Sequence, residues 1–165
     1  MRRAGVLTIS DRCAAGKAED VSGQVLEEAM RTAGYEVVRR ATLPDERELI
    51  AGWLREACDV CDLILTTGGT GFAPRDVTPE ATRDVIEREA PGIAELLRLE
   101  GLKKTPFAAL SRGVAGIRGR TLIINLPGSP RAVRESLDVL LPLLPHAIDL
   151  IQEHPTSHSP QGGAQ

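Results

Sequence analysis

One stretch of the chain, residues 63–82, joins in succession an apolar strand, a glycine-rich turn, an acidic residue and a helix start. The turn is Thr67–Gly71, and Asp76 follows it. Glycine has no Cβ, so the backbone of such a turn can adopt positive φ and approach a ligand closely, while its unpaired N–H groups favour negative charge. The stretch therefore predicts a strand–turn–helix unit with an anion site, for which phosphate is the natural ligand.

The familiar phosphate-binding patterns do not fit this turn. A Walker loop needs Gly-Lys-Ser/Thr after its four variable residues, but Gly71 is followed by phenylalanine and alanine. The dinucleotide fingerprint requires a third glycine where this chain has Pro74. The turn is thus a phosphate loop of another kind. In the helix after it we expect Thr78 to be the N-cap and Pro79 the first helical residue.

Short apolar runs alternate with helical patterns, which predicts a parallel sheet with crossover helices. The expected strands are Gly5–Ile9, Val37-Val38 and Leu63–Leu65, and the expected helices are Ser22–Thr32, Glu46–Ala57, Pro79–Arg88 and Gly92–Glu100. A chain of 165 residues is sized for one domain. We therefore expect a three-layer α/β/α domain with a mainly parallel sheet.

The last third of the chain predicts a hairpin and a broken helix. Gly113–Ile117 and Thr121–Asn125 flank a short turn, so we expect a hairpin at one edge of the sheet. A final helix starts at Ser129-Pro130, and Pro142 should interrupt it before it resumes to about residue 152. Residues 154–165 are rich in Pro, Ser, Gly and Gln, so we expect a domain over residues 1–153 and a disordered tail.

Polar side chains follow three of the predicted strands. Ser10 and Asp11 follow the first, Asp45 the second, and Thr67–Asp76 the third. Ligands of open α/β sheets bind outside the carboxyl ends of strands, where such loops converge. We therefore expect one site, assembled from distant segments. Two carboxylates facing a phosphate would repel it, whereas Mg²⁺ binds one or two carboxylates together with phosphate oxygens.

Composition argues against several kinds of function. A net charge of −3 and a pI of 5.7 give no general attraction to nucleic acid or to anionic membranes. The three cysteines are odd in number and no apolar leader follows the charged start, so we expect a reduced, cytoplasmic protein. Cys58 and Cys61 lack a second cysteine pair or a nearby histidine, which favours two buried thiols over a zinc or redox site.

The turn Thr67–Gly71, together with Arg75–Glu80, closely resembles the molybdopterin-binding loop of the MogA/MoaB-like molybdopterin adenylyltransferases. This family includes the plant Cnx and gephyrin G domains. Other parts of the chain are similar to it in the same order: Thr8–Arg12, Asp20–Gly23, Leu43–Glu46, Leu110–Gly113 and Asn125–Pro130. The resemblance spans residues 4 to 152.

The resemblance implies a MogA-like fold and a role in molybdenum cofactor biosynthesis. The implied reaction transfers the AMP portion of Mg·ATP to the terminal phosphate of molybdopterin and releases pyrophosphate. Asp45 and Asp76 match the acidic pair that the family uses with Mg²⁺ and ATP, and would be the catalytic residues and metal ligands. The resemblance also implies a homotrimer or hexamer and a downstream molybdate-insertion enzyme as a partner. From the net charge, and because no run approaches the roughly 20 apolar residues of a membrane helix, we expect no nucleic acid and no membrane as partners.

The remaining site residues are likewise carried over from the resemblance. Those expected to bind molybdopterin are Thr67, Gly68, Gly69, Thr70, Gly71, Ser111 and Arg112. Those expected to bind nucleotide are Ser10, Asp11, Ser22 and Gly23. Structural roles stay open for some of them. Thr67 and Thr70 can instead close the turn, and Arg112 can instead pair with a surface acid.

Three further alternatives concern the acids and Ser22. Asp45 can cap the helix that follows it, with Glu48 completing a capping box. Asp76 can be a surface partner of Arg75. Ser22 can be the cap of the first long helix.

Other functions also remain open. The chain can be a MoaB-type protein that binds molybdopterin without adenylylating it, a domain that serves mainly as a trimer module, or a CinA-like domain. The presence of Asp45 and Asp76 argues against the first, although Asp20–Gly23 looks more MoaB-like than MogA-like. The CinA-like loop lacks the Arg75–Glu80 motif, which argues against the last.

Overall fold

The computed structural model describes residues 1–153, so the tail predicted to be disordered, residues 154–165, lies outside the described residues. Within this range one six-stranded sheet has the order β2-β1-β3-β6-β5-β4. The strands are β1 (Arg3–Ile9), β2 (Glu36–Leu43), β3 (Leu63–Thr67), β4 (Arg88–Glu89), β5 (Ala115–Arg118) and β6 (Thr121–Leu126). The first four in the sheet are parallel, whereas β5 is antiparallel to both of its neighbours.

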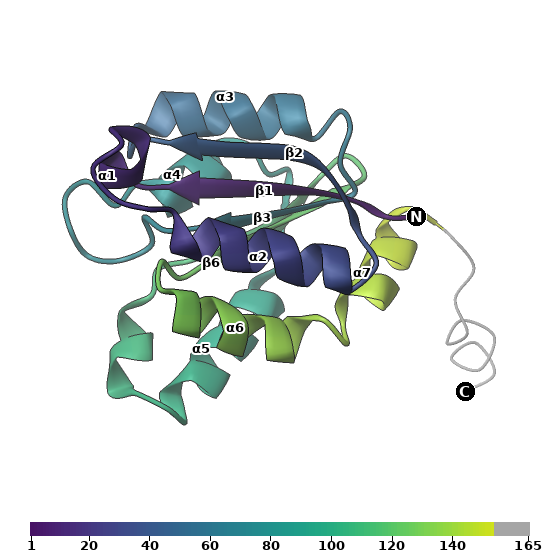
Figure 1. The fold of residues 1–165 in the computed structure, drawn as a ribbon. Helices are drawn as coiled ribbons and strands as arrows, with labels where there is room; N and C mark the ends of the chain where they lie inside the picture. The colour runs from purple at the N-terminus through teal and green to yellow at the C-terminus, as the bar shows by residue number, and fades with distance from the viewer. Residues whose placement is uncertain (154–165) are drawn as a thin grey trace.

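Helices cover both faces of the sheet (Figure 1). They are α1 (Asp11–Ala14), α2 (Val21–Thr32), α3 (Arg47–Ala57), α4 (Thr78–Arg83), α5 (Pro91–Leu102), the 3₁₀ helix η1 (Pro106–Leu110), α6 (Pro130–Leu140) and α7 (Leu144–Ile151). One face is covered by α3 and α4, and the other by α2, α5, α6 and α7. The predicted three-layer α/β/α architecture with a mainly parallel sheet is confirmed.

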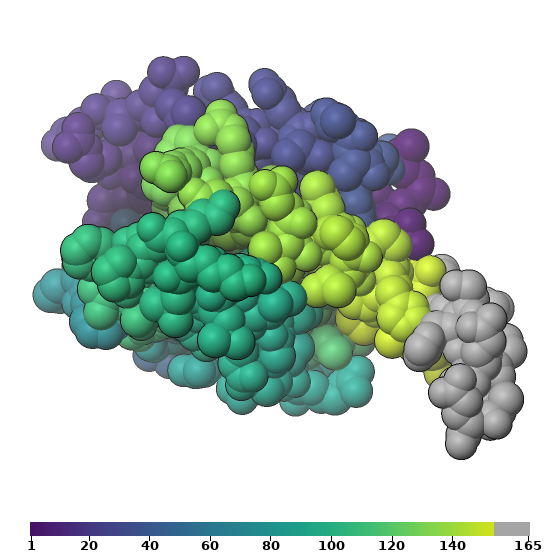
Figure 2. Space-filling view, turned by 90° about the horizontal axis from the view of Figure 1, so that it is seen from below, coloured from purple at the N-terminus to yellow at the C-terminus, as the bar shows by residue number. Residues whose placement is uncertain are grey.

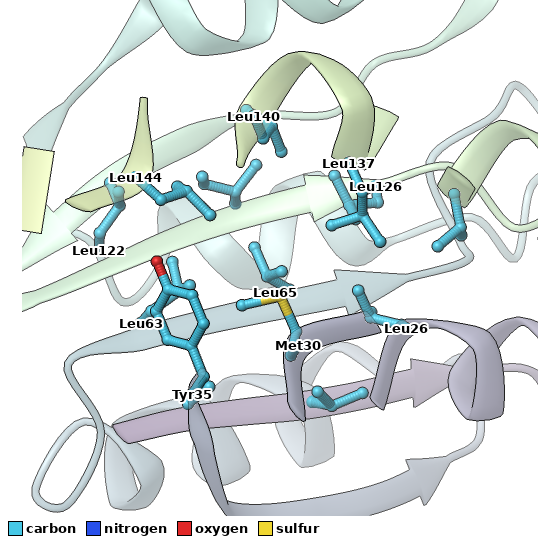
Figure 3. Packing of buried hydrophobic residues seen from close by; sticks show 14 of the residues in the cluster. Leu26, Met30, Tyr35, Leu63, Leu65, Leu122, Leu126, Leu137, Leu140 and Leu144 are labelled. Atoms are coloured by element: carbon cyan, nitrogen blue, oxygen red, sulfur yellow. The ribbon is translucent and has the colours of Figure 1, made fainter. Parts of the chain in front are cut away.

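Alternating side chains of the strands build two separate cores, because successive residues of a strand face opposite sides. Figure 3 shows the core in which β3 and β6 pack against α2, α6 and α7, formed by Leu63, Leu65, Leu122, Leu126, Leu26, Met30, Leu137, Leu140 and Leu144. On the other face, Ile64 and Ile123 pack against Ile50 and Leu54 of α3. Burial on both faces fixes the central strands, and therefore the loops at their carboxyl ends.

The helix predicted over Pro79–Arg88 is wrong in its second half. Helix α4 ends at Arg83, and the short strand β4 follows. The N–H of Glu87 donates to the carbonyl of Ile117 at 2.8 Å, so this backbone is paired with β5 rather than continuing the helix. A contact between segments 30 residues apart in the sequence thus overrides the local helical pattern.

Other predicted boundaries shift less. Strand β2 is much longer than Val37-Val38, because it pairs with β1 along its whole length. The predicted hairpin forms from β5 and β6, but β4 rather than the hairpin is the outermost strand. Pro142 separates α6 from α7 as predicted. Neither α1 nor η1 was predicted.

Candidate active site

The loops after β1, β2 and β3 meet at one edge of the sheet, at the left of Figure 1. They bring together Asp11, Asp45 and Asp76, which define what we call the acidic rim. Ser10 lies beside them as the N-cap of α1, where its hydroxyl accepts a hydrogen bond from the N–H of Cys13 at 3.1 Å. The predicted convergence of these distant segments is confirmed.

Asp11 and Asp45 are held together by two reciprocal hydrogen bonds. The N–H of Asp11 donates to Oδ2 of Asp45, and the N–H of Asp45 donates to Oδ1 of Asp11, both at 2.9 Å. Burial raises the pKa of Asp45, and repulsion from Asp11 and Asp76 adds to this effect. The structure does not realise the alternative that Asp45 caps α3. The N-cap position belongs to Glu46, which makes no side-chain capping bond.

Two glycines of the turn are required by their backbone conformation. The φ angles of Gly68 and Gly69 are +100° and +71°, which other residues adopt only under strain. A Cβ on Gly68 would collide with the carbonyl oxygen of Ile9. A Cβ on Gly69 would collide with the hydroxyl of Thr78 and would lie 3.0 Å from Oδ1 of Asp45. Protein contacts alone therefore require glycine at both positions.

Asp76 is held by a tight turn at the end of the same loop. Its Oδ2 accepts a hydrogen bond from the N–H of Ala73 at 3.0 Å, and its own N–H donates to the carbonyl of Ala73 at 2.9 Å. A Cβ on Gly71 would lie 2.9 Å from Oδ2 of Asp76, so this glycine leaves room for the carboxylate. The alternative that Asp76 pairs with Arg75 is not realised, because Arg75 pairs with Asp11.

Thr78 is the first residue of α4 and not its N-cap, so that prediction is wrong. Its hydroxyl donates to the carbonyl of Gly68 at 2.9 Å, and its N–H donates to the carbonyl of Gly69 at 3.1 Å. The start of α4 is thereby tied to the glycine turn.

Three consecutive N–H groups of the turn are free to bind an anion. Among the described residues, the N–H groups of Gly69, Thr70 and Gly71 donate to no protein acceptor, whereas that of Gly68 donates to the carbonyl of Leu126 at 3.3 Å. Consecutive unpaired N–H groups of this kind form anion-binding sites in proteins. This is the property that the sequence predicted for the turn.

The guanidinium of Arg112 holds both ends of the loop. Its Nε donates to the carbonyl of Gly71 at 2.8 Å and its Nη2 to the carbonyl of Asp76 at 2.7 Å. Its Nη1 donates to Glu80 of α4 at 2.7 Å, and this pairing lowers the pKa of Glu80. The alternative that Arg112 pairs with an acid is therefore the arrangement in the structure. Its predicted contact with molybdopterin stays a prediction.

A pocket of about 600 Å³ also borders the turn and is lined by residues of α5, η1 and α6. Figure 2 looks onto this face, where α5 and α6 lie side by side. Thr70, Gly71 and Ser111 line the pocket next to the turn, and Leu97 and Phe107 contribute apolar walls. We call this cavity the helix pocket. Three of the residues predicted to bind molybdopterin thus line one cavity.

The other predicted site residues make structural contacts. The hydroxyl of Thr67 donates to the carbonyl of Pro127 at 2.6 Å, which closes the turn. Ser22 donates to the carbonyl of Gly128 at 2.6 Å and does not cap α2. Asp20 is that cap instead.

The side chain of Asp20 accepts the N–H of Gly23 at 2.9 Å. Its other oxygen accepts the hydroxyl of Thr8 at 2.8 Å and a guanidinium N–H of Arg40. A Cβ on Gly23 would collide with this cluster. Protein contacts thus account for Ser22 and Gly23, and their contacts with a nucleotide stay predictions.

The acidic rim fits a divalent cation only in combination with ligand oxygens. No group of three or more His, Cys, Asp or Glu side chains that could hold a metal ion occurs among residues 1–153. Oδ1 of Asp45 and Oδ1 of Asp76 accept no hydrogen bond from any described residue. Two free carboxylate oxygens suit Mg²⁺, which usually completes its shell with phosphate and water.

The contacts of two residues that shape the site, Arg98 and Asp20, were not predicted from the sequence. Arg98 of α5 donates to the carbonyls of Ser111 and Gly113 at 3.3 and 2.9 Å, and no local pattern marks such a contact. Asp20 was detectable, because an aspartate three residues before Gly23 has the spacing of a helix cap.

The fold and the site define a class of protein, namely an α/β domain with a glycine-rich turn and a group of carboxylates at the carboxyl edge of its parallel strands. The chain belongs to the MoCF_biosynth family, described as "Probable molybdopterin binding domain", whose model matches residues 5–146. None of the helices within the described residues is long and apolar enough to cross a membrane.

Several relatives are similar along most of this chain. A molybdopterin adenylyltransferase from Helicobacter pylori strain J99 is 47% identical, over 89% of this chain and 86% of the relative. The molybdenum cofactor synthesis protein cinnamon from Drosophila melanogaster is 48% identical over 98% of this chain, which spans only 28% of cinnamon. The solved structure of the molybdopterin biosynthesis enzyme MoaB from Thermus thermophilus is 54% identical, with a TM-score of 0.88, and covers 94% of this chain and 99% of that one.

Proposed function

We propose that this protein transfers the AMP portion of Mg·ATP to the terminal phosphate of molybdopterin and releases pyrophosphate. The observation that carries the proposal is the turn Gly69–Gly71, which has three free N–H groups, adjoins Asp45 and Asp76 of the acidic rim and lines the helix pocket with Thr70 and Gly71. The reaction must bring the terminal phosphate of molybdopterin to the α-phosphate of ATP, and this turn borders both the acidic rim and the helix pocket. The relative from Helicobacter pylori that is named molybdopterin adenylyltransferase supports the same activity.

The turn would hold the terminal phosphate of molybdopterin through its N–H groups. Glycine at Gly69 and Gly71 lets the backbone approach that phosphate, and it also leaves room for the carboxylates of Asp45 and Asp76. Positioning of this kind supplies much of the acceleration in group transfer, because it replaces an encounter in solution by a fixed geometry.

The acidic rim would hold Mg²⁺ and the triphosphate. Oδ1 of Asp45 and Oδ1 of Asp76 would be the protein ligands of the metal. When bound, Mg²⁺ neutralises phosphate charge, including the charge that develops during transfer. Ser10 and Asp11 lie on the same rim, where the nucleotide would bind.

The helix pocket would hold the pterin. Its volume of about 600 Å³ suits a ligand of this size. Leu97 and Phe107 offer apolar surface to a flat ring, and charged side chains of both signs, among them Arg98 and Glu135, also line the pocket. A wall that combines apolar surface with a few polar groups is typical of small-molecule sites.

The resemblance also leads us to propose a cytoplasmic homotrimer that passes its product to a molybdate-insertion enzyme. Leu99 and Leu102 of α5 are exposed, which supports association between copies of the chain. A protein that binds molybdopterin without adenylylating it is the second candidate function. The stretch Asp20–Gly23, which looks more MoaB-like than MogA-like, is the feature that favours it.

The test is incubation of the purified protein with Mg·ATP and molybdopterin, followed by measurement of adenylyl-molybdopterin and pyrophosphate. We expect both products in equal amounts. Binding of molybdopterin without either product would establish the second candidate instead.

A further inference from the structure

The acidic rim carries one cation of its own, Arg75. Its Nε donates to Oδ2 of Asp11 at 3.0 Å and its Nη2 to Oδ1 at 2.8 Å, a two-pronged ion pair. The side chain of Arg75 is 61% exposed and that of Asp11 42%. Exposed ion pairs contribute little net free energy, so this pair can open at small cost.

Asp11 does not depend on Arg75 for its position. Its Oδ1 also accepts the N–H of Asp45, and its own N–H donates to Asp45. Among the described residues, Nη1 of Arg75 donates to no acceptor, so the guanidinium has N–H groups available for a further ligand. The ion pair can therefore break without disturbing the two aspartates beneath it.

A triphosphate brings strong negative charge into a rim that already holds several acids. Arg75 interacts electrostatically with Asp45 and Glu46 as well as with Asp11. A guanidinium binds phosphate oxygens in the same two-pronged geometry as a carboxylate. Phosphate oxygens are thus natural competitors of Asp11 for this side chain.

We propose that Arg75 exchanges Asp11 for the β- and γ-phosphates of the incoming nucleotide and remains with pyrophosphate as it leaves. The inference rests on the proposed function. In that reaction an oxygen of the pterin phosphate forms a bond to the α-phosphorus. The bond from the α-phosphorus to the bridging oxygen breaks, and pyrophosphate takes the electron pair. Arg75 then stabilises the charge on the leaving group.

The competing explanation is that the Arg75–Asp11 ion pair only fixes the loop against α1. The two explanations predict different results for two single variants. A purely structural ion pair is lost equally in Arg75→Ala and in Asp11→Asn. Under the exchange, Arg75→Ala removes the phosphate ligand, whereas Asp11→Asn releases Arg75 for phosphate. In Asp11→Asn the amide oxygen can still accept the N–H of Asp45.

The experiment is calorimetric titration of the full chain with Mg·pyrophosphate, which excludes any contact to the nucleoside. We expect Arg75→Ala to raise Kd about tenfold or more, the loss typical of a hydrogen-bonded charged group. Arg75→Lys should retain part of the affinity. Asp11→Asn should bind at least as tightly as the wild type. Arg31→Ala, which removes an exposed arginine of α2 paired with Glu27, is the control for net charge and should not change Kd.

Parallel weakening in Arg75→Ala and Asp11→Asn would overturn the inference, as would an unchanged Kd in Arg75→Ala or no binding to the wild type. Circular dichroism verifies that each variant folds. The proposed function is judged separately by AMP transfer in the wild type. If the wild type transfers AMP while both variants weaken pyrophosphate binding, only the inference falls. If it transfers none while the variants diverge as expected, only the function falls.

Discussion

The acidic rim and the helix pocket both border one glycine turn, yet they are built differently. The rim is positioned at the carboxyl ends of parallel strands by bonds between backbone N–H groups and carboxylates, such as the reciprocal pair of Asp11 and Asp45. The pocket is formed by side chains of α5, η1 and α6, and its Phe107 is 75% exposed. The proposed function assigns the chemistry to the rim and the binding of the pterin to the pocket, so substitutions in the two regions should have separable effects.

Asp76→Asn should have the largest effect, and only on chemistry. It removes a charge at the proposed metal site while retaining an oxygen that can accept the N–H of Ala73. We expect AMP transfer to fall about a thousandfold, because metal ligands stabilise transition-state charge by several kcal/mol. Molybdopterin affinity, measured by titration, and circular dichroism should not change.

Asp59→Asn is the matched control, since Asp59 is exposed near the opposite ends of the strands. If Asp76→Asn transferred AMP as fast as the control variant, Asp76 would have no role in the mechanism. Loss of folding in Asp76→Asn would show that its role is structural.

Arg112→Lys should affect both regions, because Arg112 spans them. Lysine keeps the charge opposite Glu80 but cannot reach two carbonyls and a carboxylate at once. We expect AMP transfer to drop by about 30-fold and molybdopterin affinity by a few-fold, together with a loss of about 1 kcal/mol in the free energy of unfolding.

Kinetics and urea unfolding measure these changes. Arg47→Lys, which alters the exposed pair with Asp84, is the control and should be close to the wild type. If Arg112→Lys lowered the free energy of unfolding but left the rate of AMP transfer unchanged, Arg112 would not position the loop for catalysis.

Phe107→Ala should affect binding alone. Removal of an aromatic wall should weaken molybdopterin affinity about tenfold, as expected for apolar area that the ligand no longer covers. The rate at saturating molybdopterin and the affinity for Mg·ATP should hardly change. Phe72→Ala is the control, since Phe72 is 68% exposed and does not line the pocket. Equal losses of molybdopterin affinity in the two variants would mean that the pterin does not bind in the helix pocket.

Asp45→Asn should change stability only slightly, and the change should be favourable. Burial raises the pKa of Asp45 above its usual 3.8, so the folded state binds this proton more tightly than the unfolded state does. The contribution of Asp45 to the free energy of unfolding therefore falls as pH rises through its folded-state pKa. This contribution stays lower at neutral pH.

The neutral asparagine avoids this loss. At pH 7 the melting temperature should rise by on the order of 1–2 °C, while AMP transfer should fall as in Asp76→Asn because Asp45 is the other proposed metal ligand. The difference should shrink as pH falls towards 3.8. A variant less stable than the wild type at neutral pH would show that the carboxylate stabilises the fold instead.

Local patterns predicted most of the architecture, and non-local contacts explain the errors. The run Leu63–Thr67 is buried throughout, so its apolar character sufficed to identify a central strand. The segment after Arg83 has a helical pattern but pairs with β5, and its partner lies too far along the chain for a local pattern to reveal it.

The sequence by itself determined the layered fold, the position of the glycine turn and the edge at which the acids gather. These follow from the spacing of apolar residues and from where each strand ends. The tertiary structure alone decided which donors and acceptors meet: Asp45 with Asp11 rather than its own helix, Arg75 with Asp11 rather than Asp76, and Arg112 with the loop. Hydrogen bonds between such groups depend on distances of about 3 Å across separate segments, and no pattern along one segment specifies them.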